Sequence, residues 1–172
     1  ASRAIVEAVA GRVRDYGIRS LVVDPIMCSG SGTPLLGTDG IGALRNLLVP
    51  LSFLITPNLD EAGVLSDRKI DSLPEMEDAA RRIYEMGPRN VLVKGGHLGS
   101  GPAVDVFFDG KDLVRLPGER VLTSDAHGTG CVLSAAITAY LARGCTIDDA
   151  VRSGKTFVTE AIRRSLRLGQ GP

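Results

Sequence analysis

The sequence predicts a three-layer α/β protein, in which a mainly parallel sheet is covered by helices on both faces. Short runs of β-branched residues alternate with amphipathic helical patterns along most of the chain. The run at residues 21–23 is apolar throughout and is flanked by helices, which is typical of a parallel strand buried on both faces. The 172 residues contain no internal repeat and no linker, so we predict one domain with a substantial core.

The predicted elements follow one another in a regular order. Helical periodicity predicts helices over residues 2–16, 39–48, 73–86, 132–141 and 146–166, with a further helix starting at Asn58. Apolar runs predict strands at residues 21–23, 53–55 and 91–93, and two mainly apolar runs on either side of a turn predict strands at residues 104–108 and 113–116. Asp109 and Gly110 predict a turn between the last two strands, so one antiparallel hairpin joins the sheet. Thr146 is expected to cap the last helix, with Asp149 three positions on.

Composition excludes several classes of protein. The formal net charge is zero, with 20 basic and 20 acidic residues, which is not the charge pattern of a nucleic-acid-binding protein. No apolar run approaches the length of a membrane span, and the first residues do not form a signal peptide. The cysteines, Cys28, Cys131 and Cys145, give neither a disulfide framework nor a zinc pattern. We therefore expect a cytoplasmic protein without a nucleic-acid or membrane partner.

Residues 128–131, with the sequence Gly-Thr-Gly-Cys, lie between a strand-like run and a long apolar helix. Glycines at the first turn of a helix allow the backbone to turn tightly, so that its N–H groups converge on one point. The helix dipole adds partial positive charge at the same point. This turn therefore predicts an anion site for a phosphate, or for the charge that develops during phosphoryl transfer.

Cys131 lies one residue inside this turn. The helix dipole is expected to lower the pKa of its thiol, which would allow it to accept a proton from a substrate hydroxyl. The alternative is a structural turn followed by a buried cysteine, since free cysteine is among the most buried residue types. The residues of the turn alone leave both interpretations open.

Polar residues follow each of the predicted parallel strands. Asp24 follows the first, residues 56–61 the second, and Lys94 the third. In an open sheet of this kind, ligands bind beyond the carboxyl ends of the strands. Lys94 would neutralise phosphate charge there, while Asp24 and Glu61 would hold a magnesium ion directly or through water. The set predicts a site for a nucleoside triphosphate with a divalent metal.

Each of these residues also has a structural interpretation. Asn58 and Glu61 have the spacing of a helix N-cap residue and its partner, a role compatible with ligand binding. Lys94 is also interpreted as a strand-end lysine that extends to water, and Asp24 before Pro25 as a turn residue. The two histidines, His97 and His127, do not have the spacing of a metal cluster, and we interpret them as hydrogen-bonding loop residues.

Four segments occur in an order that resembles a known family. They are residues 23–27 (VDPIM), 55–62 (ITPNLDEA), 91–97 (VLVKGGH) and 127–131 (HGTGC). The chain resembles the hydroxymethylpyrimidine/phosphomethylpyrimidine kinases of thiamin biosynthesis, in the ribokinase-like superfamily. The resemblance implies ATP- and Mg²⁺-dependent phosphorylation of 4-amino-5-hydroxymethyl-2-methylpyrimidine and then of its monophosphate. It also implies a homo-oligomer, because dimers are usual in this superfamily.

The resemblance also implies roles for single residues. Gly128, Thr129 and Gly130 would form the anion hole, and Cys131 would be the base in place of the aspartate that most of the superfamily carries. Lys94 would contact the ATP phosphates. The magnesium and phosphate region would be served by Asn58, Glu61 and Asp24.

Two departures from the family keep alternatives open. Nothing matches the N-terminal third of the family pattern, so we interpret residues 1–172 as a single ribokinase-like kinase domain without that segment. The loop at residues 29–32 is also richer in glycine than the family pattern. One alternative is a pyridoxal kinase of the same fold, because some of these also carry Gly-Thr-Gly-Cys. The other is a truncated, non-catalytic nucleotide-binding module.

Overall fold

A five-stranded sheet forms the centre of the protein in the computed structural model, which describes residues 1–30, 32–96, 98, 102–119 and 128–164. The strands lie side by side in chain order, from β1 to β5. Their bounds are β1 (Val22–Val23), β2 (Leu54–Ile55), β3 (Val91–Val93), β4 (Ala103–Phe108) and β5 (Leu113–Gly118). The α-helices are α1 (Arg3–Asp15), α2 (Thr38–Ala43), α3 (Leu59–Ser66), α4 (Leu73–Tyr84), α5 (Thr129–Ala142) and α6 (Ile147–Arg163).

The strand directions confirm the predicted sheet and its hairpin. β1 pairs in parallel with β2, and β2 with β3. β4 runs antiparallel to β3, and β5 antiparallel to β4. Because the direction reverses twice, β5 points the same way as β1, β2 and β3. The carboxyl ends of these strands therefore face one edge of the sheet, which is where α5 follows β5 along the chain.

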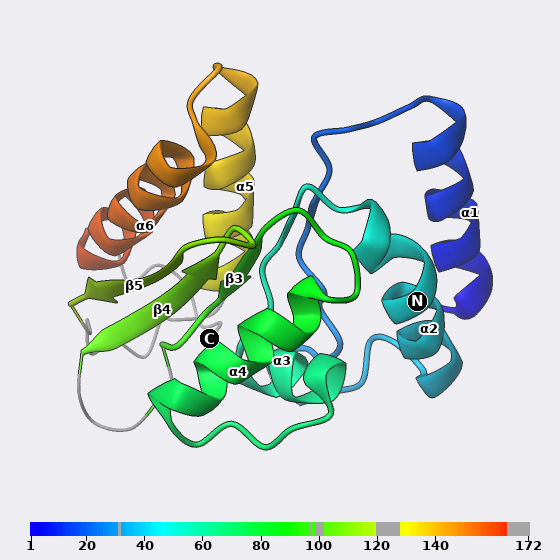
Figure 1. Ribbon diagram of the computed structural model, residues 1–172, viewed down its shortest axis with the longest axis horizontal. Coiled ribbons are helices and arrows are strands. Elements are labelled where there is room, and N and C mark those ends of the chain that lie inside the picture. Colours follow the sequence, from blue (N-terminus) through cyan, green and yellow to red (C-terminus); the bar gives the residue numbers. More distant parts are fainter. Residues whose placement is uncertain (31, 97, 99–101, 120–127, 165–172) are drawn as a thin grey trace.

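Helices cover both faces of the sheet, which confirms the three layers (Figure 1). Alternate side chains of β3 point to opposite faces, because successive residues of a strand alternate. Val91 and Val93 pack in a core with residues of α3 and α4, whereas Leu92 packs in a second core with Leu133 and Ile137 of α5. The sheet therefore holds the N-terminus of α5 and the N-terminus of α3 on opposite sides of its carboxyl edge.

The helix predicted over residues 39–48 is divided in the structure. α2 ends at Ala43, a π-helical turn η1 (Leu44–Leu48) follows, and a 3₁₀ turn η2 (Val49–Leu51) completes the segment. Pro50 has no N–H group to continue an α-helix, which explains the change in hydrogen-bond pattern. The other predicted helices are confirmed, with ends displaced by a few residues; the predicted end at residue 166 lies outside the described residues.

Two predicted turn devices are present as hydrogen bonds. In the hairpin, Oδ1 of Asp109 accepts from the N–H groups of Lys111 (2.8 Å) and Asp112 (2.7 Å). At the start of α6, Oγ1 of Thr146 accepts from the N–H of Asp149 at 3.2 Å. These side chains set the register of β4 with β5 and the first residue of α6.

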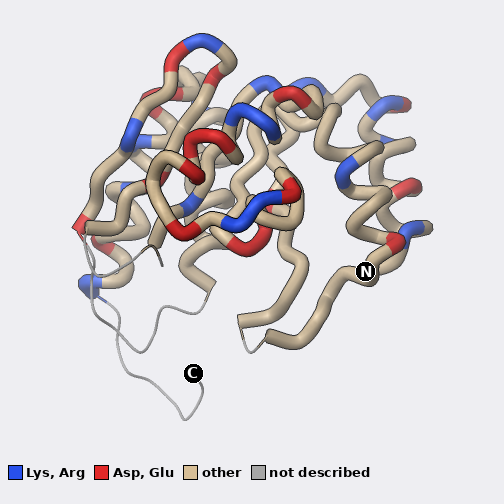
Figure 2. The backbone as a smooth tube through the Cα atoms, turned by 60° about the horizontal axis from the view of Figure 1, so that its bottom comes forward, with Lys and Arg blue, Asp and Glu red and all other residues tan. Residues whose placement is uncertain are grey.

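The surface carries both signs of charge. Acidic and basic residues are interspersed along the backbone in Figure 2, and neither sign has a face of its own in that view. Among the helices that the structure describes, none is long and apolar enough to cross a membrane. The charge distribution agrees with the balanced composition of the sequence.

Candidate active site

The segments after β2 and β3 continue to pair beyond the ends of the strands. The N–H of Lys94 donates to the carbonyl of Pro57 at 2.8 Å, and Asn58 and Lys94 form a further parallel bridge. The polar residues that follow the two strands are therefore adjacent, as the sequence predicts. This pairing holds Lys94 directly beside the start of α3.

Asp24 connects four elements at this edge. Its Oδ1 accepts from Nζ of Lys94 at 2.8 Å and from Oγ1 of Thr56 at 3.1 Å, and its Oδ2 accepts from Oγ of Ser134 at 3.3 Å. The side chains of Asp24 and Lys94 are only 12% and 14% exposed. A charge pair this far removed from water needs several hydrogen bonds to hold it, and Asp24 has them.

The ammonium of Lys94 also lies against the first turn of α5. A Cβ atom placed on Gly130 would be 3.0 Å from Nζ of Lys94, so the absence of a side chain there allows this approach. Gly128 precedes the helix with a φ of 79°, in the left-handed region that favours glycine. The N–H groups of a first helical turn have no carbonyl partner within the helix. Positive charge and N–H donors therefore meet at one point, as an anion site requires.

The predicted lowering of the Cys131 pKa is wrong. Cys131 is an exposed residue, yet partial burial of its thiol is the largest cause of a raised pKa. The charge of Asp24 and a hydrogen bond to its carboxylate raise the pKa further, and Lys94 offsets only part of the effect. Burial and the nearby carboxylate together outweigh the lowering effect of Lys94, so the protonated thiol is the favoured form.

The structural interpretation of Asn58 and Glu61 is confirmed. The N–H of Asn58 donates to Glu61 Oε2 at 2.8 Å, and the N–H of Glu61 donates to Asn58 Oδ1 at 2.9 Å. This reciprocal pair is a capping box at the start of α3. Burial raises the pKa of Glu61, while its hydrogen bond from Asn58 and the charge of Lys94 act in the opposite direction. A role toward a ligand is compatible with this capping.

The carboxylates of the site suit a magnesium ion that is held largely by other ligands. Among the described residues, no group of three or more His, Cys, Asp or Glu side chains is placed to hold a metal. Magnesium keeps several waters and commonly takes one or two carboxylates together with phosphate oxygens. Asp24 and Glu61 provide that kind of oxygen donor, so the residues fit magnesium bound chiefly to a nucleotide.

Two residues of the site were given no role by the sequence analysis. Thr56 is completely buried and Ser134 is 8% exposed, and both donate to Asp24. Ser134 lies three residues after Cys131, on the same face of α5, and this spacing is the signal that would have identified it. The two predicted loop histidines, His97 and His127, lie outside the described residues.

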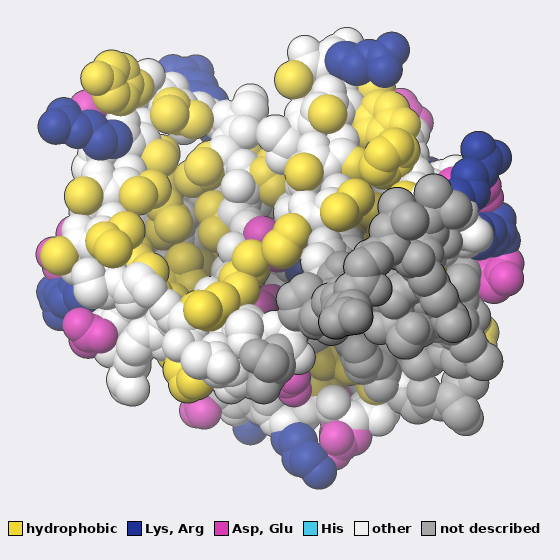
Figure 3. Space-filling view, turned by 180° about the vertical axis from the view of Figure 1, so that it is seen from behind, with side chains coloured by type: hydrophobic (Ala, Val, Ile, Leu, Met, Phe, Trp, Pro, Cys, Tyr) yellow, Lys and Arg dark blue, Asp and Glu magenta, His cyan; other side chains and the backbone are white. Residues whose placement is uncertain are grey.

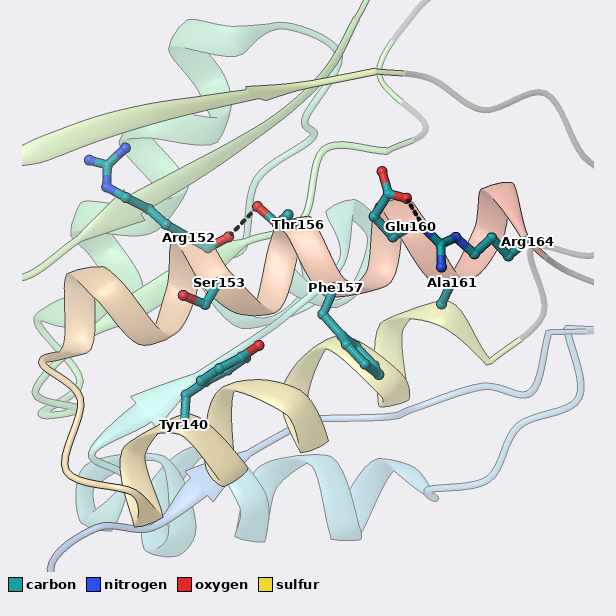
Figure 4. A pocket seen from close by; sticks show the side chains of 8 residues that line it. All are labelled: Tyr140, Arg152, Ser153, Thr156, Phe157, Glu160, Ala161 and Arg164. Carbon is teal, nitrogen blue, oxygen red and sulfur yellow. Dashed lines mark hydrogen bonds and ion pairs between the residues drawn. The ribbon is translucent and has the colours of Figure 1, made fainter.

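A hollow of about 600 Å³ on the outer side of α5 and α6 contains none of the predicted site residues. Tyr140 of α5 and Phe157 of α6 lie in the space between the two helices (Figure 4). Glu160 forms an ion pair with Arg164 at 3.6 Å along the rim. The strand-end site is therefore defined by converging polar groups and backbone, and this hollow is a separate surface feature.

Relatives share most of the chain but are longer than it. A protein of Rhizobium meliloti called hydroxymethylpyrimidine/phosphomethylpyrimidine kinase is 45% identical over 172 residues, which cover 98% of this chain and 64% of the relative. The thiamine biosynthesis bifunctional protein ThiED of Geobacter sulfurreducens is 40% identical, over 96% of this chain and 34% of the relative. The chain thus spans a third to somewhat under two thirds of these relatives.

Solved structures agree on the fold, and a family model gives the family. An ADP complex of Bacillus subtilis pyridoxal kinase superposes with a TM-score of 0.89 at 36% identity, over 97% of this chain and 62% of that one. Phosphomethylpyrimidine kinase from Clostridium difficile gives 0.82 at 38% identity, over 94% and 65%. These likenesses confirm the ribokinase-like α/β fold. The sequence model of the family described as phosphomethylpyrimidine kinase matches residues 1–172. The chain therefore belongs to the phosphomethylpyrimidine kinase family.

Proposed function

We propose that this chain carries the phosphoryl-transfer site of a hydroxymethylpyrimidine/phosphomethylpyrimidine kinase of thiamin biosynthesis. It would transfer the γ-phosphoryl group of ATP to the hydroxymethyl oxygen of the pyrimidine, and then a second one to the monophosphate. The observation that carries the proposal is the position of the Lys94 ammonium against Gly130, at the first turn of α5. We also propose that the protein acts in the cytoplasm as a homo-oligomer.

The anion site would bind the phosphates of ATP. The Lys94 ammonium and the N–H groups of the turn at residues 128–130 supply positive charge and donors within one small region. Both are fixed before the nucleotide arrives, which is the arrangement that stabilises charge developing in a transition state. Bound magnesium would neutralise phosphate charge further, with Glu61 and, through a water molecule, Asp24 as its protein oxygen donors.

Cys131 would take part in moving the substrate proton. As a thiol hydrogen-bonded to Asp24, it accepts the hydroxyl proton only when its own proton passes to the carboxylate. The substrate oxygen then forms its bond to the γ-phosphorus while the bond to the ADP oxygen breaks. The proton is received by the pair of Cys131 and Asp24 rather than by a preformed thiolate.

The first test is ATP consumption by this protein with magnesium present. We expect turnover with hydroxymethylpyrimidine and none with pyridoxal. Cys131→Ala is expected to lower kcat at least a hundredfold while the Kd for ATP changes less than threefold, since proton transfer acts in the transition state. Unchanged turnover in this variant would exclude Cys131 from the proton transfer, and ATP binding without turnover on either compound would favour the non-catalytic module.

A pyridoxal kinase is the second candidate, because pyridoxal kinase structures superpose with TM-scores as high as 0.89. One of these, from Staphylococcus aureus, is a complex with AMP-PCP and pyridoxal, and it is 33% identical to this chain. Turnover on pyridoxal alone in the same assay would select this candidate. Turnover on both compounds would indicate a kinase with two substrates.

A further inference from the structure

A second buried ion pair lies behind Lys94, outside the site described above. Nζ of Lys155 on α6 lies 2.5 Å from Oδ2 of Asp105 on β4, and the two side chains are 16% and 10% exposed. Lys155 also donates to the carbonyl of Ala103 at 3.2 Å. The other oxygen of Asp105, Oδ1, accepts from the N–H of Gly95 at 2.9 Å. The pair therefore holds the peptide group that directly follows Lys94.

The backbone at Gly95 packs so closely against β4 and Met76 that there is no room for a side chain. A Cβ atom on Gly95 would lie 1.9 Å from the carbonyl oxygen of Val104 and 2.8 Å from Cε of Met76. The Asp105 carboxylate and these two neighbours thus determine where the chain leaves β3. Because Lys94 directly precedes Gly95, the position of its backbone is fixed as well. The Lys94 side chain therefore extends to Gly130 from a defined position.

The same pair connects Lys94 to the helix that forms the anion turn. Lys155 follows Gly154, and a Cβ atom on Gly154 would lie 2.7 Å from Cγ1 of Ile137 on α5. This close contact fixes α6 to α5, the helix whose first turn contains Gly130. One chain of contacts therefore runs from Lys94 through Asp105 and α6 to α5, and returns to Lys94 at Gly130.

We propose that Asp105 and Lys155 are positioning residues for phosphate binding: they hold the Gly95 peptide, and through it the Lys94 ammonium, against the first turn of α5. The inference rests on the proposed function in so far as Lys94 meets the ATP phosphates. It assigns a role to a carboxylate and a lysine that do not themselves touch substrate.

The test compares two double variants that differ only at residue 105. Asp105→Leu with Lys155→Met removes the pair and the acceptor for Gly95, whereas Asp105→Asn with Lys155→Met removes both charges but keeps an acceptor oxygen. Both avoid an unpaired buried charge, and replacing a buried ion pair by residues of similar volume is often tolerated. Arg115→Met, which removes a pair between β5 and Glu77 of α4, is the matched control.

The readout is the ratio of the Kd for AMP to the Kd for ATP, measured by calorimetry at a temperature where each variant is folded by circular dichroism. We expect this ratio to fall at least tenfold in the leucine variant. In the asparagine variant and in Arg115→Met it should stay within threefold of the parent's ratio. Loss of general structure would weaken both nucleotides alike. In a Lys94→Met background, the leucine variant should have no further effect on the ratio.

Three results would overturn the proposal: an unchanged ratio in the leucine variant, an equal loss in the asparagine variant, or a loss that persists without Lys94. The measurement needs no pyrimidine, so a parent protein that prefers ATP but phosphorylates nothing would refute the proposed function alone. A parent protein that does not prefer ATP over AMP would refute both.

Discussion

Cys131 lies where a helix N-terminus favours the thiolate and a neighbouring carboxylate disfavours it. Because burial and Asp24 raise the pKa of its thiol, the fraction of thiolate grows only at alkaline pH. We expect alkylation of Cys131 by iodoacetamide to be slow at pH 7 and to accelerate with a midpoint above the ordinary thiol pKa of 9.0. The rate is followed by mass spectrometry in a variant without Cys28 and Cys145.

The matched variant for this measurement is Asp24→Asn. It removes the carboxylate charge that raises the Cys131 pKa, so the midpoint should move to lower pH. A midpoint below 9.0 with Asp24 present would contradict the assignment.

Glu61 combines a capping role with the cost of a buried charge. Its raised pKa means that the folded state binds this proton more tightly than the unfolded state, so the contribution of Glu61 to stability falls as the pH rises through the folded pKa. Glu61→Gln keeps an acceptor for the Asn58 N–H and removes the charge. We expect the difference in the free energy of unfolding between this variant and the parent to be more favourable to the variant at pH 7 than at pH 4. Urea unfolding at the two pH values measures it.

Asn58→Ala provides the contrast, because it removes the cap without altering a charge. It should lower the free energy of unfolding by about 1 kcal/mol at both pH values. If Glu61→Gln instead loses more stability at pH 7 than at pH 4, the carboxylate charge stabilises the fold and burial is not its dominant effect.

At the level of the helix, the first turn of α5 depends on a missing side chain. Gly130→Ala would place a methyl group 3.0 Å from Nζ of Lys94, and the flexible lysine would have to shift away from the turn. We expect the Kd for ATP to rise about tenfold, the equivalent of roughly 1.4 kcal/mol. The melting temperature should change little, because the displaced group is the end of a side chain.

Gly11→Ala is the control for this helix substitution. Gly11 is inside α1, and a Cβ atom there meets nothing within 4 Å. Alanine should stabilise α1 by up to about 1 kcal/mol and leave the Kd for ATP unchanged. Equal ATP affinity in the two variants would show that Lys94 does not act at Gly130.

Over the whole molecule, apolar side chains gather on one face, around a hollow between the side of α1 and the side of α5 (Figure 3). Ile5 and Val9 of α1 are 55% and 44% exposed, and Val132 of α5 is 41% exposed. An apolar face of this kind favours association. We expect the 172-residue chain to form concentration-dependent oligomers in light scattering after size-exclusion chromatography.

The double variant Ile5→Glu with Val9→Glu should shift this equilibrium toward the monomer. Val64→Glu is its control, since Val64 is equally exposed, at 48%, but on α3. Association that is insensitive to the α1 charges would place the contact elsewhere on the surface.

The order of the elements and the convergence at the strand ends were predictable, because both follow from periodicity and from the geometry of parallel strands. The side-chain interactions at the carboxyl edge of the sheet were not predictable from the sequence. Asp24 is separated in sequence from Thr56 by 32 residues, from Lys94 by 70 and from Ser134 by 110, and no local pattern encodes such pairs. The pKa of Cys131 is raised first by burial of its thiol and then by the distant Asp24, and neither effect is visible in the local sequence, which explains why the helix dipole alone predicted the wrong direction.

The agreement between strand order and chain order bears on how the protein is made. As the chain leaves the ribosome, each strand meets a neighbour that has already emerged, so the sheet can grow one strand at a time. Lys94 can pair with Asp24 once β3 has emerged, but the turn at Gly128 and the anchoring Lys155 are synthesised much later. A nascent chain therefore contains a sheet before it contains all the parts of the proposed phosphate site, which is completed only once α5 and α6 have been synthesised.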